Sequence, residues 1–299
     1  MKISGFTFVR NGTIAGYPFI ESIRSLLPLV DEFVVNVGAG SDDTLDKIKA
    51  LAAEQPKIRI IESIWNEKMK QKGFVYAQQK MIAQYSCTGD WAFYLEADEV
   101  VHENDIPQLR ALMERHLDNP EIEALAFDYY HFYGSPQHLW LPPSPYFREV
   151  RVIRNTIRSY APDGLFWVVM DRNKRGRYPY AALTHTRIYH YGHVRSAEKE
   201  DMKRKLVMKY WDASVPTAAE KYYYGNVDPD GVGLFTGTHP ALMKEWLATE
   251  ANPSFEFNPH YIPTRRDRRH RFARWFERKT GLRMPMIKGH FILKDSDPD

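Results

Sequence analysis

The chain has 299 residues, of which 43% are hydrophobic and 14% aromatic, and it carries a formal net charge of +3. These values exclude general disorder and indicate one large domain, or a domain with appendages, around a substantial core. The small net charge by itself indicates no class of partner. The single cysteine, Cys87, excludes an intramolecular disulfide framework and a cysteine-rich metal site.

The hydropathy pattern is that of a chain outside the membrane interior. No apolar run reaches the roughly 18 residues that a transmembrane helix needs. The opening residues, MKISGFTFVRNG, lack the apolar stretch and the cleavage site of a signal peptide. A lone cysteine suits a reducing compartment. We therefore expect a cytoplasmic protein.

Strand and helix patterns alternate through the first hundred residues. Short apolar strands are predicted at 3–9, 33–37, 57–63 and 91–95. Apolar residues at helical spacing predict helices at 19–27, from about 44 to 52, and 67–85. The alternation predicts an α/β fold, with a mostly parallel, Rossmann-like central sheet that helices cover on both faces.

After residue 120 the pattern changes to strands without intervening helices. These strands are predicted at 124–133, 148–155, 164–170 and 183–191. They predict antiparallel additions to the sheet. A proline-rich loop, a helix, a glycine-rich stretch and a basic helical tail are expected at 141–146, about 196–211, 222–240 and 263–284. We interpret the chain as two halves of one domain and a C-terminal helical, basic extension, with boundaries at 1–120, 121–240 and 241–299.

The segment GDWAFYLEADE (89–99) ends an apolar strand with Glu96, Asp98 and Glu99. In parallel sheets ligands bind beyond the carboxyl ends of the strands, which makes these side chains candidates for a site. Carboxylates held close together repel, and a cation relieves that repulsion. Oxygen ligands beside a phosphate favour Mg²⁺ or Mn²⁺. From spacing alone, an acidic surface turn is the alternative, and Glu99 is undecided between ordering the loop and facing water.

A second loop, NVGAGSDDT (36–44), follows the second predicted strand. Its glycines let the backbone approach a ligand, and Asp42 and Asp43 can accept hydrogen bonds from a ribose, a base or helix amides. The loop lacks the GxGxxG pattern of a phosphate site, so a nucleoside contact fits it better. Plain capping of the next helix by Asp43 or Thr44 is the alternative.

The order of these segments resembles the nucleotide-sugar half of family 2 glycosyltransferases, which have the GT-A fold. The likeness covers residues 3–100 and extends more loosely to REVRVIRN, YHYGHVRSAEK and FTGTHP. The resemblance implies a metal-dependent, inverting enzyme that uses a UDP- or GDP-sugar, a glycan or lipid-linked acceptor, and Mn²⁺ or Mg²⁺. It makes 1–120 the nucleotide-sugar-binding half and 121–240 the acceptor-binding half of one GT-A domain.

The resemblance also implies roles for individual residues in nucleotide and metal binding. Asn11 would line the nucleoside pocket, Asn36 stands in place of the usual base-reading Asp, and Asp42 matches the Asp of an Asp-Gly-Thr motif. Asp98 matches the metal-ligating second Asp of an Asp-x-Asp motif, and Glu96 replaces the first. Because Asn36 adds a hydrogen-bond donor where the family has an Asp, the identity of the base is open. Glu96 keeps the charge and lengthens the reach.

Residues from the second half would complete the site. In similar enzymes a late histidine joins the metal or diphosphate site, and we assign His190 of HYGH this role, with His193 as the alternative. An inverting transfer also needs a general base for the acceptor hydroxyl. Glu149 and Asp163 are the candidates for this base. Each of these residues also has a purely structural interpretation, as a hydrogen-bonded histidine or a surface ion-pair partner.

The stretch 265–284 contains nine Lys and Arg residues against two acidic residues. Phe272, Trp275, Phe276 and Lys279 fall on one helical face. This pattern predicts a peripheral contact with an anionic membrane at its inner face. The alternative is that the aromatic face docks on the catalytic domain and leaves the arginines in water. No nucleic-acid-reading motif accompanies the charge, so nucleic acid is not an expected partner.

Two other functions are compatible with acidic residues at the edge of such a sheet. One is a nucleotidyltransferase acting on a sugar phosphate. Against it, FVRNGTIAGYP has only Arg10 near the expected triphosphate. The other is a catalytically inactive nucleotide-sugar-binding protein, which the departures at Asn36 and Glu96 allow.

Overall fold

The computed structural model describes residues 1–143, 146–211, 225–251, 255–282 and 289–293. Parts of five sequence predictions lie outside these residues: the half at 121–240, the loop at 141–146, the glycine-rich stretch at 222–240, the tail at 263–284 and the extension at 241–299. In the described part of the chain, no helix is both long enough and apolar enough to cross a membrane.

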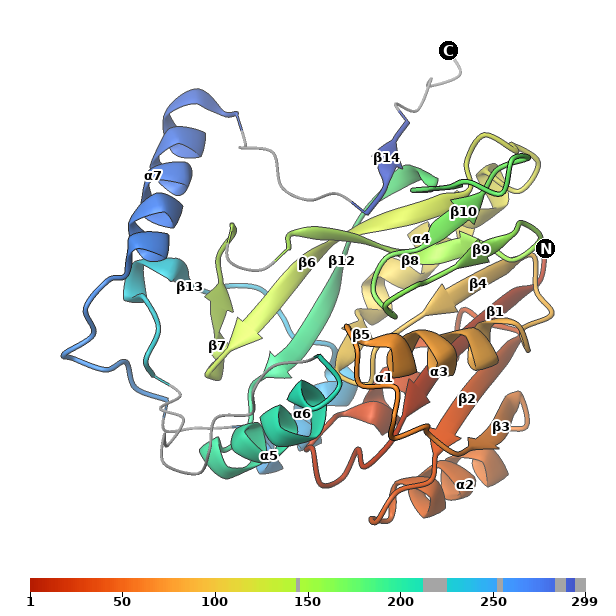
Figure 1. Cartoon of the computed structure of the whole chain (residues 1–299), viewed down its shortest axis with the longest axis horizontal. Helices are drawn as coiled ribbons and strands as arrows, with labels where there is room; N and C mark the ends of the chain where they lie inside the picture. Colours follow the sequence, from red (N-terminus) through yellow and green to blue (C-terminus); the bar gives the residue numbers. More distant parts are fainter. Residues whose placement is uncertain (144–145, 212–224, 252–254, 283–288, 294–299) are drawn as a thin grey trace.

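Four parallel strands form the first half of the central sheet, in the order β4-β1-β2-β3. They are β1 (Ile3–Val9), β2 (Glu32–Gly38), β3 (Ile58–Ser63) and β4 (Trp91–Tyr94). The connecting helices are α1 (Phe19–Leu26), α2 (Thr44–Glu54) and α3 (Phe74–Gln84). Figure 1 shows these helices packed along the sheet, so the predicted α/β fold with helices on both faces is confirmed.

Side chains alternate between the two faces of the sheet along each strand, so they contribute to a core cluster on each face. Phe33 and Val35 of β2 pack in a cluster with α1, α2 and the additional helix α4 (Ile106–Arg115). Val34, between them, packs in a second cluster with Ala83 of α3 and with Trp167. Successive side chains of a strand point to opposite faces, so an uninterrupted apolar strand supplies both clusters.

The second half continues the same sheet with antiparallel strands, giving the order β13-β7-β6-β8-β4-β1-β2-β3. The added strands are β6 (Ala124–Tyr133), β7 (Ser135–Trp140), β8 (Arg148–Arg154) and β13 (Val232–Leu234). The long strand β12 (Tyr180–His193) runs parallel to β6 and also pairs with β5 (Glu99–Val101) and β14 (Phe291–Ile292). A separate small sheet consists of β9 (Ser159–Tyr160), β10 (Val168–Met170) and β11 (Gly176–Arg177).

Two predicted elements are shorter than expected, for local reasons. Helix α3 begins at Phe74 rather than 67, because Lys72 and Gly73 have positive φ angles of 46° and 71° that a right-handed helix excludes. The strand expected at 164–170 begins at Val168. Gly164, with φ of 82°, and the Asp163 carboxylate, which accepts a hydrogen bond from the Leu165 amide, form a turn there instead.

The remaining helices lie around the second half of the sheet. They are α5 (Ala197–Met208), α6 (Lys244–Thr249) and α7 (Arg265–Thr280), with short 3₁₀ turns at η1 (Glu103–Asp105), η2 (Pro229–Gly231) and η3 (Ala241–Met243). Ser196 caps α5 by accepting a hydrogen bond from the Lys199 amide, and Thr264 with Asp267 forms a capping box on α7. Figure 1 shows α7 standing apart from the central sheet, at the end of the molecule beyond β13.

Candidate functional site

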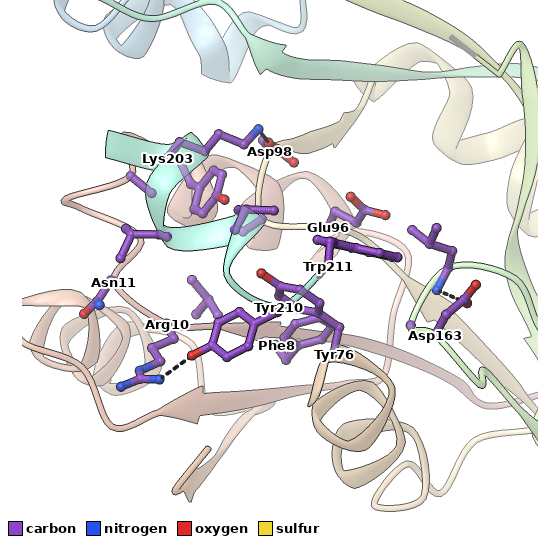
Figure 2. Close-up of a pocket in the computed structure, with 18 of the residues that line it drawn as sticks. Phe8, Arg10, Asn11, Tyr76, Glu96, Asp98, Asp163, Lys203, Tyr210 and Trp211 are labelled. Carbon is purple, nitrogen blue, oxygen red and sulfur yellow. Dashed lines mark hydrogen bonds and ion pairs between the residues drawn. The ribbon is translucent and has the colours of Figure 1, made fainter. Parts of the chain in front are cut away.

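A cavity of about 410 Å³ opens where β1 and β4 end, at the carboxyl edge of the parallel strands. Its walls come from the end of β1, the loop after β4, the end of β12 and the second half of α5. Figure 2 shows Lys203 of α5 on one side of this cavity and Asp163 on the other. The sheet therefore provides a ligand crevice at the edge where the strand pattern predicts one.

Aromatic rings form much of the cavity wall: Phe8, Trp65, Tyr76, Tyr94, Tyr210 and Trp211. Tyr76 stands at the centre of this group. Its ring centroid is 5.5 Å from that of Trp65, edge to face, and 6.1 Å from that of Trp211, stacked. Arg10 adds a charged group beside them by donating a 3.1 Å hydrogen bond to the Tyr210 hydroxyl. Such a wall offers flat π faces on which a planar base or the apolar face of a sugar can pack.

The loop after β4 is held by an ion pair in the core. The Arg151 guanidinium binds both carboxylate oxygens of Glu99 at 2.7 Å, and the Arg151 and Glu99 side chains are 2% and 0% exposed. Glu99 also accepts hydrogen bonds from the Glu96 amide at 3.0 Å and from the Tyr129 hydroxyl at 2.9 Å. Glu99, whose role the sequence leaves undecided, therefore orders the loop.

Glu96 lies at the edge of this ion pair and faces the cavity. Its Oε1 atom is 3.0 Å from Nη2 of Arg151. Burial, and then the negative charge of Glu99, raise the pKa of the Glu96 carboxyl. A cation bound next to Glu96 would oppose both effects and stabilise the ionised carboxylate.

Asp98 is surrounded by cationic groups. Its Oδ2 atom lies 2.9 Å from Nζ of Lys203 and 3.6 Å from Nη2 of Arg195. Burial alone raises the pKa of a carboxyl, but Lys203, His190 and Arg195 together hold the pKa of Asp98 well below its usual range. Asp98 is therefore a carboxylate, although its side chain is only 6% exposed.

Hydrogen bonds determine which nitrogen of His190 is protonated. Nε2 of the buried His131 lies 2.6 Å from the Tyr146 carbonyl oxygen, which can only accept, so the proton of His131 is on Nε2. Burial, and then the neighbouring His190, lower the pKa of His131 well below its usual value. Its Nδ1 is thus an acceptor, and His190 Nδ1, 2.8 Å away, donates to it. In neutral His190 this leaves Nε2 with a free lone pair, 3.6 Å from Oδ1 of Asp98.

Glu96, Asp98 and His190 together provide a donor set for a metal ion. Each offers one ligand atom, and these atoms lie within 4.8 Å of one another. Nε2 of His190 and Oδ1 of Asp98 are 3.6 Å apart, and a cation between these two atoms could bind both. Two carboxylates and an imidazole suit Mn²⁺, and the oxygen ligands also suit Mg²⁺. The residues present therefore fit such an ion.

Comparison with protein families matches residues 17–166 to the family described as "Glycosyl transferase family 2". The chain belongs to glycosyl transferase family 2. The resemblance stated from the sequence is thereby confirmed, as is the enzyme class. No curated protein matches the chain.

Three solved structures are similar to this glycosyltransferase. TarS of S. aureus is 13% identical with a TM-score of 0.41, over 72% of this chain and 41% of that chain. The mannosyltransferase PcManGT of Pyrobaculum calidifontis, in complex with GDP-Man and Mn²⁺, is 16% identical with a TM-score of 0.32, over 42% and 35%. Glucosyl-3-phosphoglycerate synthase of Mycobacterium tuberculosis, with Mn²⁺ and UDP-Glc, is 20% identical with a TM-score of 0.29, over 43% and 44%. This chain thus spans less than half the length of each.

The residues of the glycosyltransferase that were assigned to nucleotide binding lie in two places. Asn11 and Glu96 line the cavity. Asn36 is fully buried and donates hydrogen bonds at 2.9 Å to the backbone oxygen and to Oε1 of Gln79. Asp42 accepts hydrogen bonds from the Ile14 and Thr44 amides and so ties the loop after β2 to the loop after β1. Neither Asn36 nor Asp42 is among the residues that line this cavity.

Trp65 lies against the carboxyl end of β2. The Trp65 indole, which lines the cavity, packs directly on Gly38, two residues beyond Asn36 in β2. A Cβ atom at residue 38 would collide with the indole, so only glycine permits this approach. Where β2 ends, the cavity is therefore lined by Trp65, which follows β3, and not by a side chain of β2.

The structure separates the two candidates for the general base. Asp163 is half-buried and lines the cavity. Glu149, in β8, is 3% exposed and does not line it. Burial raises the pKa of the Glu149 carboxyl to about 7, against the opposing charge of Arg151. Both histidines line the cavity. His190 belongs to the donor set, whereas Nδ1 of His193 lies 2.8 Å from Oε1 of Glu200.

Sequence reasoning missed several residues that shape the site. Lys203, Tyr210 and Trp211 reach the cavity from the second half of α5 and just beyond it. Lys80 is fully buried beneath the Asp163 turn, where its ammonium donates to the Gly164 and Leu165 carbonyl oxygens at 3.1 Å. In the sequence, these lysines are indistinguishable from the solvated lysines of any polar helix face, because their partners lie far away along the chain.

Proposed function

We propose that this glycosyltransferase moves a sugar from a nucleotide-diphospho-sugar to a hydroxyl of a glycan or lipid-linked acceptor, with inversion at the anomeric carbon. The observation that carries the proposal is the cavity, which joins an aromatic wall to the Glu96, Asp98 and His190 donor set. Membership of the family supports the transfer reaction. The donor, the acceptor and the stereochemistry are the parts that we add.

Glu96, Asp98 and His190 would hold Mn²⁺ or Mg²⁺. When bound, a divalent cation supplies positive charge that stabilises the diphosphate leaving group. His131 orients His190 for this task, because its Nδ1 accepts a hydrogen bond from His190 Nδ1 and leaves Nε2 available. Arg151 and Glu99 hold the loop that carries the two carboxylates.

The other residues of the cavity would bind the donor and move the acceptor proton. The aromatic wall would receive the base or sugar, and Asn11 would contact the nucleoside. The acceptor oxygen attacks the anomeric carbon while the bond from that carbon to the diphosphate breaks. The carboxylate of Asp163 takes the hydroxyl proton. Residues 1–120 would thus bind the donor and residues 121–240 the acceptor. Asn36 and Asp42 would shape the nucleotide-binding loop from outside the cavity.

Ligand-dependent thermal stability tests this proposal. The purified protein is heated with UDP, GDP, their sugars and nucleoside triphosphates, with and without Mn²⁺. We expect a diphosphate with Mn²⁺, at about 100 times its Kd, to stabilise the protein by about 2.7 kcal/mol, or roughly 5 °C in Tm. Asp98→Asn should lose the part of the shift that depends on Mn²⁺.

The control for this experiment is Asp201→Asn. Asp201 lies on α5 and forms partly exposed ion pairs with Lys205 and Arg204, so its loss should leave the Mn²⁺-dependent shift intact. Stabilisation by triphosphates alone would replace the proposal with a nucleotidyltransferase. The absence of any nucleotide response would replace it with an inactive binding protein.

We also propose that α7 touches an anionic membrane. Arg271 pairs with Asp228 at 2.7 Å and with Asp230 at 2.9 Å, so α7 docks on η2 through Arg271. Phe272 and Trp275 stack 5.7 Å apart and are 55% and 49% exposed. The alternative, in which the aromatic face docks on the catalytic domain, would instead bury these two rings. Exposed aromatic rings on a helix rich in Arg match the headgroup region of an anionic bilayer.

Cosedimentation with vesicles tests the membrane contact. Vesicles with phosphatidylserine should sediment the wild-type protein at low salt, and phosphatidylcholine vesicles should not. Phe272→Asp with Trp275→Asp should reduce the bound fraction at least about tenfold, because the change removes apolar contact and adds repulsion. Ile64→Asp is the matched control, since Ile64 is an 86% exposed apolar residue after β3. Equal binding by both variants would show that α7 makes no such contact.

A further inference from the structure

Lys203 occupies a special position in the cavity. Its ammonium donates to Oδ2 of Asp98 at 2.9 Å and to the Gly192 carbonyl oxygen at 2.8 Å, and its side chain is 16% exposed. Figure 2 shows Lys203 extending from α5 to Asp98 at the edge of the cavity. The carboxylate to which the proposed function assigns a divalent cation is therefore already paired with a cation from the chain.

The charged side chains next to the donor set form one cluster of two ion-paired groups. In the first, Glu96 and Glu99 share Arg151, which leaves one negative unit. In the second, Asp98 and Glu200 are balanced by Arg195 and Lys203. Counting only these carboxylate, guanidinium and ammonium groups, the loss of Lys203 leaves one negative unit in each group, and together these are the charge that a divalent cation neutralises.

Lys203 is the member of the cluster that can leave it. The Arg195 and Arg151 side chains are 0% and 2% exposed, and Arg195 also donates to the Ala15 and Tyr191 carbonyl oxygens. Lys203 instead lines the cavity and carries its charge on a long, flexible side chain. An ammonium 2.9 Å from a ligand oxygen would lie close to any cation bound there, and two positive charges at that separation repel strongly.

We propose that Lys203 and a divalent cation are alternative partners of Asp98. Lys203 neutralises Asp98 while the site is empty, leaves when a cation binds, and then pairs with the diphosphate of the donor. This inference rests on the proposed function, since it assumes a cation and a diphosphate in this cavity. Its consequence is that Lys203 opposes cation binding in the absence of the donor and favours the complex of cation and donor.

Mn²⁺ titration followed by the electron paramagnetic resonance signal of free Mn²⁺ tests this exchange. Lys203→Met should bind Mn²⁺ about tenfold more tightly than the wild type when no nucleotide is present, because the repulsion is gone. The same variant should bind UDP, or GDP in a parallel series, about tenfold more weakly at saturating Mn²⁺, because the diphosphate has lost a cationic partner. A merely damaged site would weaken both affinities.

Three further variants complete the experiment. Lys203→Gln repeats the test with a polar side chain in case the methionine variant does not fold, and Lys203→Arg, which keeps the charge, should retain weak Mn²⁺ binding. Lys205→Met is the control, because Lys205 lies on the same helix and pairs with Asp201 at 2.7 Å. Unchanged or weaker Mn²⁺ binding by both neutral variants overturns the exchange. If the wild type shows Mn²⁺-dependent nucleotide binding in that case, the proposed function survives. If no protein binds Mn²⁺, both proposals fail.

Discussion

Replacing Asp163 with asparagine is expected to lower kcat by about a thousandfold, within the range of 10²–10⁴ typical of a lost general base. Asp163 lines the cavity, and asparagine keeps the shape and the oxygen that accepts the Leu165 amide. It cannot accept a proton from the acceptor hydroxyl. The rate is measured as nucleoside diphosphate released from the donor in the presence of acceptor. Donor affinity, measured by thermal shift, should stay unchanged.

Asp171→Asn is the matched control for this prediction. Asp171 holds a neighbouring turn in the same way, with Oδ1 accepting the Asn173 and Arg175 amides, but it does not line the cavity. Its replacement should leave kcat within about twofold, because a change in turn stability alone removes no transition-state interaction. If Glu149→Gln lowers kcat while Asp163→Asn retains it, the base is Glu149 and the assignment of Asp163 is wrong.

Replacing Arg151 with methionine is expected to lower the free energy of unfolding by about 3–5 kcal/mol, the usual cost of breaking a buried ion pair on one side. Glu99, whose side chain is 0% exposed, would then be left charged without its partner. Glu99 orders the loop after β4, which carries Glu96 and Asp98. Mn²⁺ binding should therefore weaken in the same variant. Urea denaturation measures the stability, and a lower midpoint at an unchanged slope shows that the free energy of unfolding itself has fallen.

A double variant distinguishes the effect of the unpaired buried carboxylate on stability from the effect of lost packing. Arg151→Met with Glu99→Gln should be more stable than Arg151→Met alone, because no unpaired carboxylate remains in the core. Arg24→Met is the exposed counterpart. It breaks the ion pair of Arg24 with Glu54, whose two members are 42% and 59% exposed. It should lower the free energy of unfolding by at most about 0.5 kcal/mol. A loss under about 1 kcal/mol for Arg151→Met would contradict the buried-pair interpretation.

Much of the architecture follows from local patterns. A strand buried on both faces needs an unbroken apolar run, as in WAFY of β4, and the residue after it must turn at the sheet edge. For this reason the chain order of the strands and the location of a ligand edge were predictable from the sequence. The beginning of α3 was not, because lysine has no preference for the positive φ that Lys72 adopts just before the helix.

By itself, the sequence determined the family, the α/β architecture and the loop that carries Glu96 and Asp98, because these follow from periodicity and from motifs short enough to be read along the chain. Only the tertiary structure decided which side chains complete the site. Lys203 lies 105 residues from Asp98, and His131 lies 59 residues from His190. Their proximity arises because β6 and β12 pair and because α5, which follows β12, brings Lys203 to the cavity. Charge, burial and tautomer depend on such distances in space, which residue order does not contain.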